Sequence, residues 1–134
     1  MIISAEEFLL LRSSDHTQDY GRAINECAAL ETWFEIIRHY PAMREWVALN
    51  KTVPIEVLEA LTCDESPTVR GNVAMKNKIT REIFEILADD KDASIRNRLV
   101  YNKNIPKDLL LKLTNDDESF IRKNAINKIS ENSE

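Results

Sequence analysis

Residues 102–127 have the sequence NKNIPKDLLLKLTNDDESFIRKNAIN, and residues 76–101 before them have KNKITREIFEILADDKDASIRNRLVY. Residues 50–75, NKTVPIEVLEALTCDESPTVRGNVAM, show the same order of apolar and charged positions. The three segments start 26 residues apart and need no gap. Such a period is typical of repeat proteins, in which each copy is one supersecondary unit that buries its apolar face against the next copy.

Several positions keep their chemical type in every copy. The apolar columns are Val53, Ile79, Ile105; Leu58, Phe84, Leu110; Leu61, Leu87, Leu113; Val69, Ile95, Ile121; and Val73, Leu99, Ala125. An acidic column holds Asp64, Asp90 and Asp116, and an arginine column holds Arg70, Arg96 and Arg122. The apolar columns recur at helical spacing on both sides of a polar break, which predicts two short helices in each repeat.

Local signals support this division into helix pairs. Thr80 is expected to cap the first helix of the second repeat, Pro67 to open the second helix of the first repeat, and Pro106 to take a first helical position. Helices of this length are marginal in water by themselves. Their stability is therefore expected to come from stacking of one repeat on the next.

A degenerate copy precedes the three regular ones. Pro41, Met43, Arg44 and Val47 stand 26 residues before Pro67, Val69, Arg70 and Val73. An atypical first copy is expected because a repeat array needs a cap. The predicted organisation is one helical-repeat domain over residues 1–134, with an N-terminal helical cap (1–31), a degenerate repeat (32–49), three repeats (50–75, 76–101 and 102–127) and a tail (128–134).

The repeated block resembles the leucine-rich repeat variant, a short relative of HEAT repeats, from Asn50 to Asn127 and more loosely over 33–49. This resemblance implies an all-α, right-handed α-solenoid of 26-residue helix pairs, in which one helix of a pair can be a 3₁₀ helix. The founding member of that family carries an iron–sulfur cluster on an N-terminal group of cysteines. This chain has no comparable group, so no cofactor is expected.

Composition narrows the setting. The net charge is −5, which weighs against a protein that depends on the phosphate backbone for affinity, so nucleic acid is not the expected partner. Cys27 and Cys63 are expected to be small buried hydrophobes in a reducing cytoplasm, and the N-terminal residues do not resemble a signal peptide. No apolar run approaches the length of a membrane span.

The charged columns have two interpretations. They pair within repeats as Asp64–Arg70, Asp90–Arg96 and Asp116–Arg122, and such a row of charges can hold a ligand. The favoured interpretation is a structural ladder, in which each aspartate bridges the inter-helix turn and each arginine ties it to the next repeat.

Columns of changing type are the better candidates for binding. Second helices commonly line the concave face of a helical solenoid, which is the usual binding surface. The residues expected there are Trp46, Asn72, Lys76, Arg98, Tyr101 and Asn124. Tryptophan, tyrosine and arginine dominate interface energetics, although partial burial in the core is the alternative for the two aromatic residues. Lys76, Lys78, Arg98 and Lys103 are a candidate basic cluster on one rim.

No catalytic constellation is found, since the two histidines lack metal-ligand spacing and the glycines form no phosphate loop. The prediction is a non-enzymatic, cytoplasmic, bacterial-type protein-binding module, a monomer when free. An immunity or antitoxin-like inhibitor is the favoured form, because residues 1–49 carry eight acidic and four basic groups and would suit a basic protein partner. The alternative is a HEAT-like nucleic-acid-binding protein or an enzyme resembling DNA glycosylases.

Overall fold

The computed structural model describes residues 1–132 and is all-helical over that range. It contains ten α-helices and one 3₁₀ turn there, and the described residues form no strand beyond an isolated bridge between Ile2 and Ala28. The prediction of an all-α protein is confirmed. The helices form two compact units, Met1–Leu61 and Thr62–Glu134, and the boundary falls between the two helices of the first predicted repeat.

The first unit contains the predicted cap and the degenerate repeat. Its elements are α1 (Ala5–Ser13), α2 (Thr17–Asn25), α3 (Leu30–His39), a 3₁₀ turn (Pro41–Met43), α4 (Arg44–Leu49) and α5 (Ile55–Leu61). Helix α1 packs against α2 and α3, while α4 packs against α2, α3 and α5. Ser4 caps α1 by accepting a hydrogen bond from the backbone N–H of Glu7.

Aromatic residues fill the centre of the first unit. Phe8 and Trp33 are fully buried, and their rings meet edge to face with centroids 5.7 Å apart. This is a preferred geometry for aromatic pairs because a ring edge is positive and a ring face negative. Trp33 takes the place of the repeat leucine Leu58, so the degenerate copy keeps its core position with a larger side chain.

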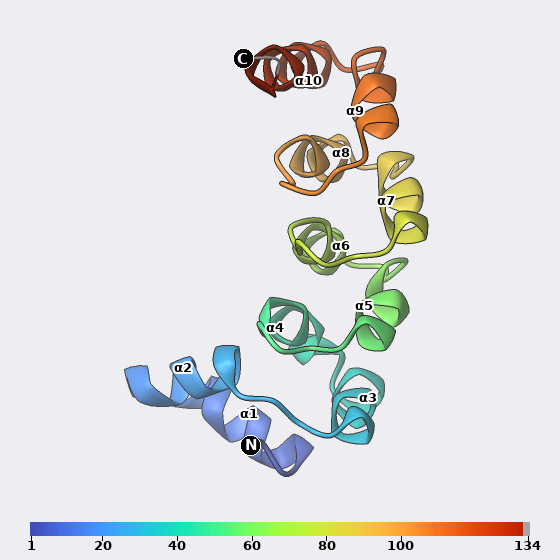
Figure 1. Ribbon diagram of the computed structural model, residues 1–134. Helices are drawn as coiled ribbons and strands as arrows, with labels where there is room; N and C mark the ends of the chain where they lie inside the picture. The colour runs from blue at the N-terminus through green and yellow to red at the C-terminus, as the bar shows by residue number, and fades with distance from the viewer. Residues whose placement is uncertain (133–134) are drawn as a thin grey trace. The chain divides into compact units, whose positions relative to one another are not determined.

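The second unit consists of α6 (Pro67–Ala74), α7 (Arg81–Ala88), α8 (Ala93–Val100), α9 (Lys107–Leu113) and α10 (Ser119–Asn132). Helix α8 packs between α6 and α10, and α7 packs against both α8 and α9. Second helices of successive repeats therefore form one layer and first helices another (Figure 1). The repeated apolar columns lie between these layers, as Leu87, Leu99 and Leu113 show by being fully buried or nearly so.

The helix ends follow the sequence signals with one exception. Thr80 caps α7 by accepting a hydrogen bond from the N–H of Ile83, and Pro67 is the first residue of α6. The placement of Pro106 in the first helical turn was wrong: with ψ at 139° it is the extended residue before α9, which begins at Lys107. Helix α10 also continues past the predicted repeat end to Asn132.

The predicted burial of both cysteines was wrong. Cys27 and Cys63 are exposed and unpaired thiols. Cys27 lies in the connection between α2 and α3, and Cys63 lies in the turn after α5. Neither cysteine lies on the apolar face of a helix. The residue type alone therefore did not predict whether the side chain is buried.

Candidate partner-binding surface

The charges that recur in each repeat form contacts between neighbouring helix pairs. Arg70 donates from Nε and Nη2 to the carboxylate of Asp90, at 2.8 and 3.3 Å. Arg96 holds Asp116 in the same way, at 2.8 and 3.1 Å. Within its own repeat each arginine bonds backbone instead, since Arg70 Nη1 donates to the carbonyl of Asp64 and Arg96 Nη1 to that of Asp90. The side-chain pairing thus links successive repeats.

Electrostatics within these pairs favour the charged forms. The hydrogen bond to Asp90 raises the pKa of Arg70, and the hydrogen bond to Asp116 raises the pKa of Arg96. Burial works to raise the pKa of Asp116, but the hydrogen bonds from Arg96 and from the backbone N–H of Glu118 outweigh burial and keep this pKa below its ordinary value. These groups are committed to the fold, which makes them poor candidates for gripping a ligand.

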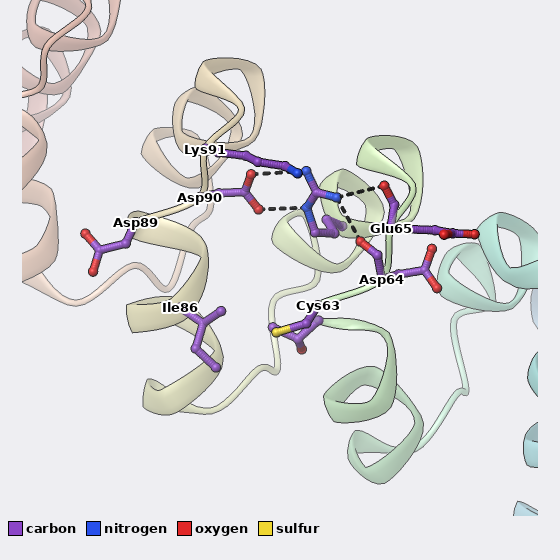
Figure 2. A pocket seen from close by; sticks show the side chains of 9 residues that line it. Cys63, Asp64, Glu65, Ile86, Asp89, Asp90 and Lys91 are labelled. Atoms are coloured by element: carbon purple, nitrogen blue, oxygen red, sulfur yellow. Dashed lines mark hydrogen bonds and ion pairs between the residues drawn. The ribbon is translucent and has the colours of Figure 1, made fainter.

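Shallow acidic grooves run along the same turns. One groove of about 320 Å³ is lined by Cys63, Glu65, Ile86, Asp89 and Lys91 (Figure 2). Asp90, bound by Arg70, also lines it. A second groove of about 610 Å³ lies one repeat further on and includes the Arg96–Asp116 pair. Because the buried carboxylates in both grooves are already bound by arginines, the grooves follow from the repeat geometry.

A buried asparagine connects the repeats on the opposite side of the second unit. The side-chain amide of Asn102 donates to the carbonyls of Ala74 and Lys76, both at 2.8 Å, and its Oδ1 accepts from the N–H of Asn104. Asn50 makes equivalent bonds to Ala23 and Glu26 within the first unit. Sequence reasoning missed this role, although an asparagine just after a helix end is a known signal for such a turn.

Arg98 is the most conspicuous exposed side chain of the second-helix layer. It lies across Gly71, where the position of an added Cβ would be 3.1 Å from Arg98 Nη1. The same nitrogen is 3.3 Å from the sulfur of Met75, a side chain that is 60% exposed. The guanidinium thus contacts Gly71 and Met75 of the preceding repeat, while Arg98 as a residue is exposed.

Tyr101 and two lysines extend this region. Tyr101 is 63% exposed at the end of α8, and the adjacent Asn102 is bonded to the residues on either side of Met75. The connections 75–80 and 101–106 contain exposed Lys78 and Lys103 and no acidic residue. We refer to Met75, Lys78, Arg98, Tyr101 and Lys103 as the Arg98 surface.

The other residues expected at a binding face are less available. Asn72 is buried, with 8% exposure, and Lys76 is half-buried. Asn124 is half-buried and donates to the side chain of Asn97 at 2.9 Å, so it bridges α10 and α8. Trp46 belongs to the first unit, where the Arg12 guanidinium stacks 3.4 Å from its ring centroid. Of this set, Arg98 and Tyr101 are the exposed residues, and Arg98 contacts Met75.

Comparison with known protein-family models, curated proteins and solved structures finds no match. Within residues 1–132, no group of three or more histidine, cysteine or acidic side chains is arranged to hold a metal ion. In the same range, every helix is too short or too polar to cross a membrane. The geometry of the exposed side chains is thus the basis for a functional proposal.

Proposed function

We propose that the protein is a non-enzymatic binding module that recognises another protein through the Arg98 surface. The observation that carries the proposal is the combination of Met75, Arg98 and Tyr101, which are large, exposed and adjacent. None of the three occupies a repeated core column, so the fold does not require their side chains. Arginine and tyrosine are also the residue types that contribute most to protein interfaces.

Pre-organisation supports the same proposal. Arg98 already rests on Gly71 and Met75 in the free protein, so binding would immobilise little additional side-chain freedom. Lys78 and Lys103 beside it favour an acidic surface on the partner. The expectation of a basic partner rested on the acidic residues of the first unit. It therefore does not concern the Arg98 surface, which lies in the second unit.

The wider setting of the Arg98 surface is also part of the proposal. The helix pairs would continue through the chain as a right-handed solenoid related to HEAT repeats, with the second helices on the concave side. A helical-repeat module suits a protein that occludes or scaffolds its partner, and an immunity or antitoxin-like inhibitor is the form we favour. A cytoplasmic location accompanies this role.

The test is affinity capture followed by calorimetry. The recovered partner is titrated with the parent protein and with Arg98→Ala and Tyr101→Ala, each expected to weaken binding by roughly 1–3 kcal/mol. Lys112→Ala, which removes an exposed lysine paired with Asp89 on the turn side, is the matched control and should bind like the parent. Equal affinity of all four proteins would refute the assignment of the surface.

Nucleic acid is the second candidate, favoured by the lysines of the two acid-free connections. Binding of duplex or single-stranded DNA or RNA through this region would fall steeply with salt, because cations are released from the phosphates. Titration with labelled oligonucleotides at two salt concentrations separates the two candidates. Micromolar, strongly salt-dependent binding that Arg98→Ala abolishes would replace the protein partner with a nucleic acid.

A further inference from the structure

The sulfur of Met75 accepts a hydrogen bond from a permanently charged donor. Arg98 Nη1 lies 3.3 Å from Sδ, and the guanidinium reaches this position by lying across Gly71, which has no Cβ to displace it. Met75 is 60% exposed, so a reagent dissolved in water can reach its side chain. A thioether sulfur is a weak acceptor with two lone pairs, and Arg98 engages one of them. The contact therefore leaves the second lone pair for reaction.

The contact between Arg98 and Met75 is not part of the repeat pattern. Tyr101 stands at the Met75 position of the next repeat. Asn124 stands at the position of Arg98, and it donates to Asn97 at 2.9 Å instead. The backbone N–H of Met75 completes the last turn of α6 without using the side chain. A chemical change at the sulfur would therefore alter the contact with Arg98 and leave the helix layers as they are.

The other two methionines of the chain are internal references. Met43, in the 3₁₀ turn of the first unit, is half-buried. Met1 is 68% exposed, but its sulfur accepts no hydrogen bond within residues 1–132. Met75 thus combines exposure with a cationic neighbour, and its response to oxidation should differ from that of both references.

We propose that Met75 is a site of oxidation by peroxides and that this modification regulates the Arg98 surface. In the reaction with hydrogen peroxide, a lone pair of Sδ attacks one oxygen, and the O–O bond breaks as the S–O bond forms. Sulfur gives up two electrons to the peroxide. The proton of the transferred oxygen passes to the departing hydroxide, which leaves as water. The product is methionine sulfoxide, a polar group in place of an apolar one.

The sulfoxide strengthens the contact with Arg98. Its oxygen carries partial negative charge and is a better acceptor than the thioether, and a hydrogen bond to it from a guanidinium is charge-assisted. Rotation about the side-chain bonds of exposed Met75 brings this oxygen to Nη1 of Arg98. The guanidinium is then bound within the chain and is less available to a carboxylate of a partner. This last consequence rests on the proposed function, whereas the oxidation and the new contact do not.

The first test follows the chemistry in a chain carrying Cys27→Ser and Cys63→Ser, because both exposed thiols also react with peroxide. After treatment of this double-serine chain with hydrogen peroxide, peptide mass spectrometry locates each added oxygen. Met75 should be oxidised about tenfold faster than half-buried Met43, and at a rate close to that of Met1. Oxidation of Met75 as slow as that of Met43 would overturn the proposal.

The second test measures whether the sulfoxide binds Arg98. Exchange of the Arg98 side-chain N–H protons with water, followed by NMR, should slow about tenfold on oxidation, because these protons become hydrogen-bonded. The control is Arg81, whose exposed side chain pairs with Glu85 and Asp108 and should exchange equally in both forms. In Met75→Leu, which has no sulfur at this position, peroxide should not change the exchange of Arg98. Equal exchange of Arg98 before and after oxidation of the double-serine chain would refute the new contact.

The third test uses the partner recovered by affinity capture. The oxidised chain should bind it about tenfold more weakly, and enzymatic reduction of the sulfoxide should restore the affinity. Met43→Leu should respond to peroxide like the double-serine chain, whereas the affinity of Met75→Leu, whatever its value, should not change. If Arg98→Ala weakens binding and oxidation does not, the proposed function stands and the regulation is refuted. If Arg98→Ala binds like the parent, the proposed function and its regulation both fail, and the first two tests still decide the modification by themselves.

Discussion

Replacement of Arg96 by alanine removes the central contact between the last two helix pairs. Arg96 gives two hydrogen bonds to the carboxylate of Asp116 and one to the carbonyl of Asp90. The side chain of Arg96 is 14% exposed and that of Asp116 only 6%. In Arg96→Ala the carboxylate of Asp116 would keep its hydrogen bond from the backbone N–H of Glu118. It would lose its cationic partner while remaining buried.

The expected cost follows from these contacts. Removing one partner of a buried ion pair costs about 3–5 kcal/mol, because the other charge stays desolvated. The retained hydrogen bond from Glu118 places Arg96→Ala at the lower end, about 3 kcal/mol. A domain is stabilised by only about 5–15 kcal/mol, so this is a large fraction of the total.

Equilibrium urea unfolding followed by circular dichroism measures this loss. With a denaturant dependence of about 2 kcal/mol per molar urea, the midpoint should fall by about 1.5 M. Arg81→Ala is the matched control, because the ion pairs of Arg81 with Glu85 and Asp108 are solvent-exposed and should leave the midpoint nearly unchanged. Equal midpoints for Arg96→Ala and the parent, with loss of partner binding, would show that the arginine column serves recognition.

Three further substitutions test other parts of the structure. Asp116→Asn should lower the free energy of unfolding at neutral pH. The pKa of Asp116 is lowered in the folded protein, so the ionised carboxylate contributes its full stabilisation above the ordinary carboxyl pKa of 3.8 and loses it as the folded-state group protonates. The stability difference between Asp116→Asn and the parent should therefore shrink as pH falls below 3.8. Urea midpoints at pH 7 and pH 3 measure the effect, and a difference that grows on acidification would contradict it. Asn102→Ala should lower the free energy of unfolding by about 2–3 kcal/mol, because it leaves buried carbonyls unpaired. Asn115→Ala, at an exposed position, is the control and should lower it little. Thermal unfolding of both variants measures the difference, and equal stability would exclude the bridging role of Asn102. Trp46→Ala and Arg12→Ala should each destabilise the first unit, and loss of the stacking contact itself should cost about 1 kcal/mol. Amide hydrogen exchange in α1 and α4 measures this loss. Unchanged protection in both variants would mean that Trp46 is free for binding.

The helical elements could be predicted well because the pattern of each one occurs several times in the repeated sequence. Leu87 and Leu113 stand in a column that recurs every 26 residues, and both are buried in the same layer. Thr80 was predictable as a cap because capping depends on chemistry within a few residues. The position of Pro106 was not, because proline fits both the cap and the first helical turn.

The candidate site was harder to predict because exposure depends on neighbours in space. Asn72 and Arg98 occupy the same column, but one is buried and the other exposed. Gly71 lets Arg98 rest on the neighbouring helix, a contact that depends on two residues 27 positions apart. Asn124 was expected to face a partner and instead bonds Asn97, which periodicity alone does not indicate.

Site-specific photocrosslinking at position 101 shows whether the Arg98 surface contacts another protein. A photoreactive phenylalanine analogue replaces Tyr101 in one sample and the exposed Glu85 of α7 in a matched sample, and both are irradiated in the native cell and analysed by mass spectrometry. We expect one dominant protein adduct at position 101 that is absent at position 85 and disappears when Arg98→Ala is added. No adduct at position 101, the same adducts at both positions, or an adduct with nucleic acid would contradict it.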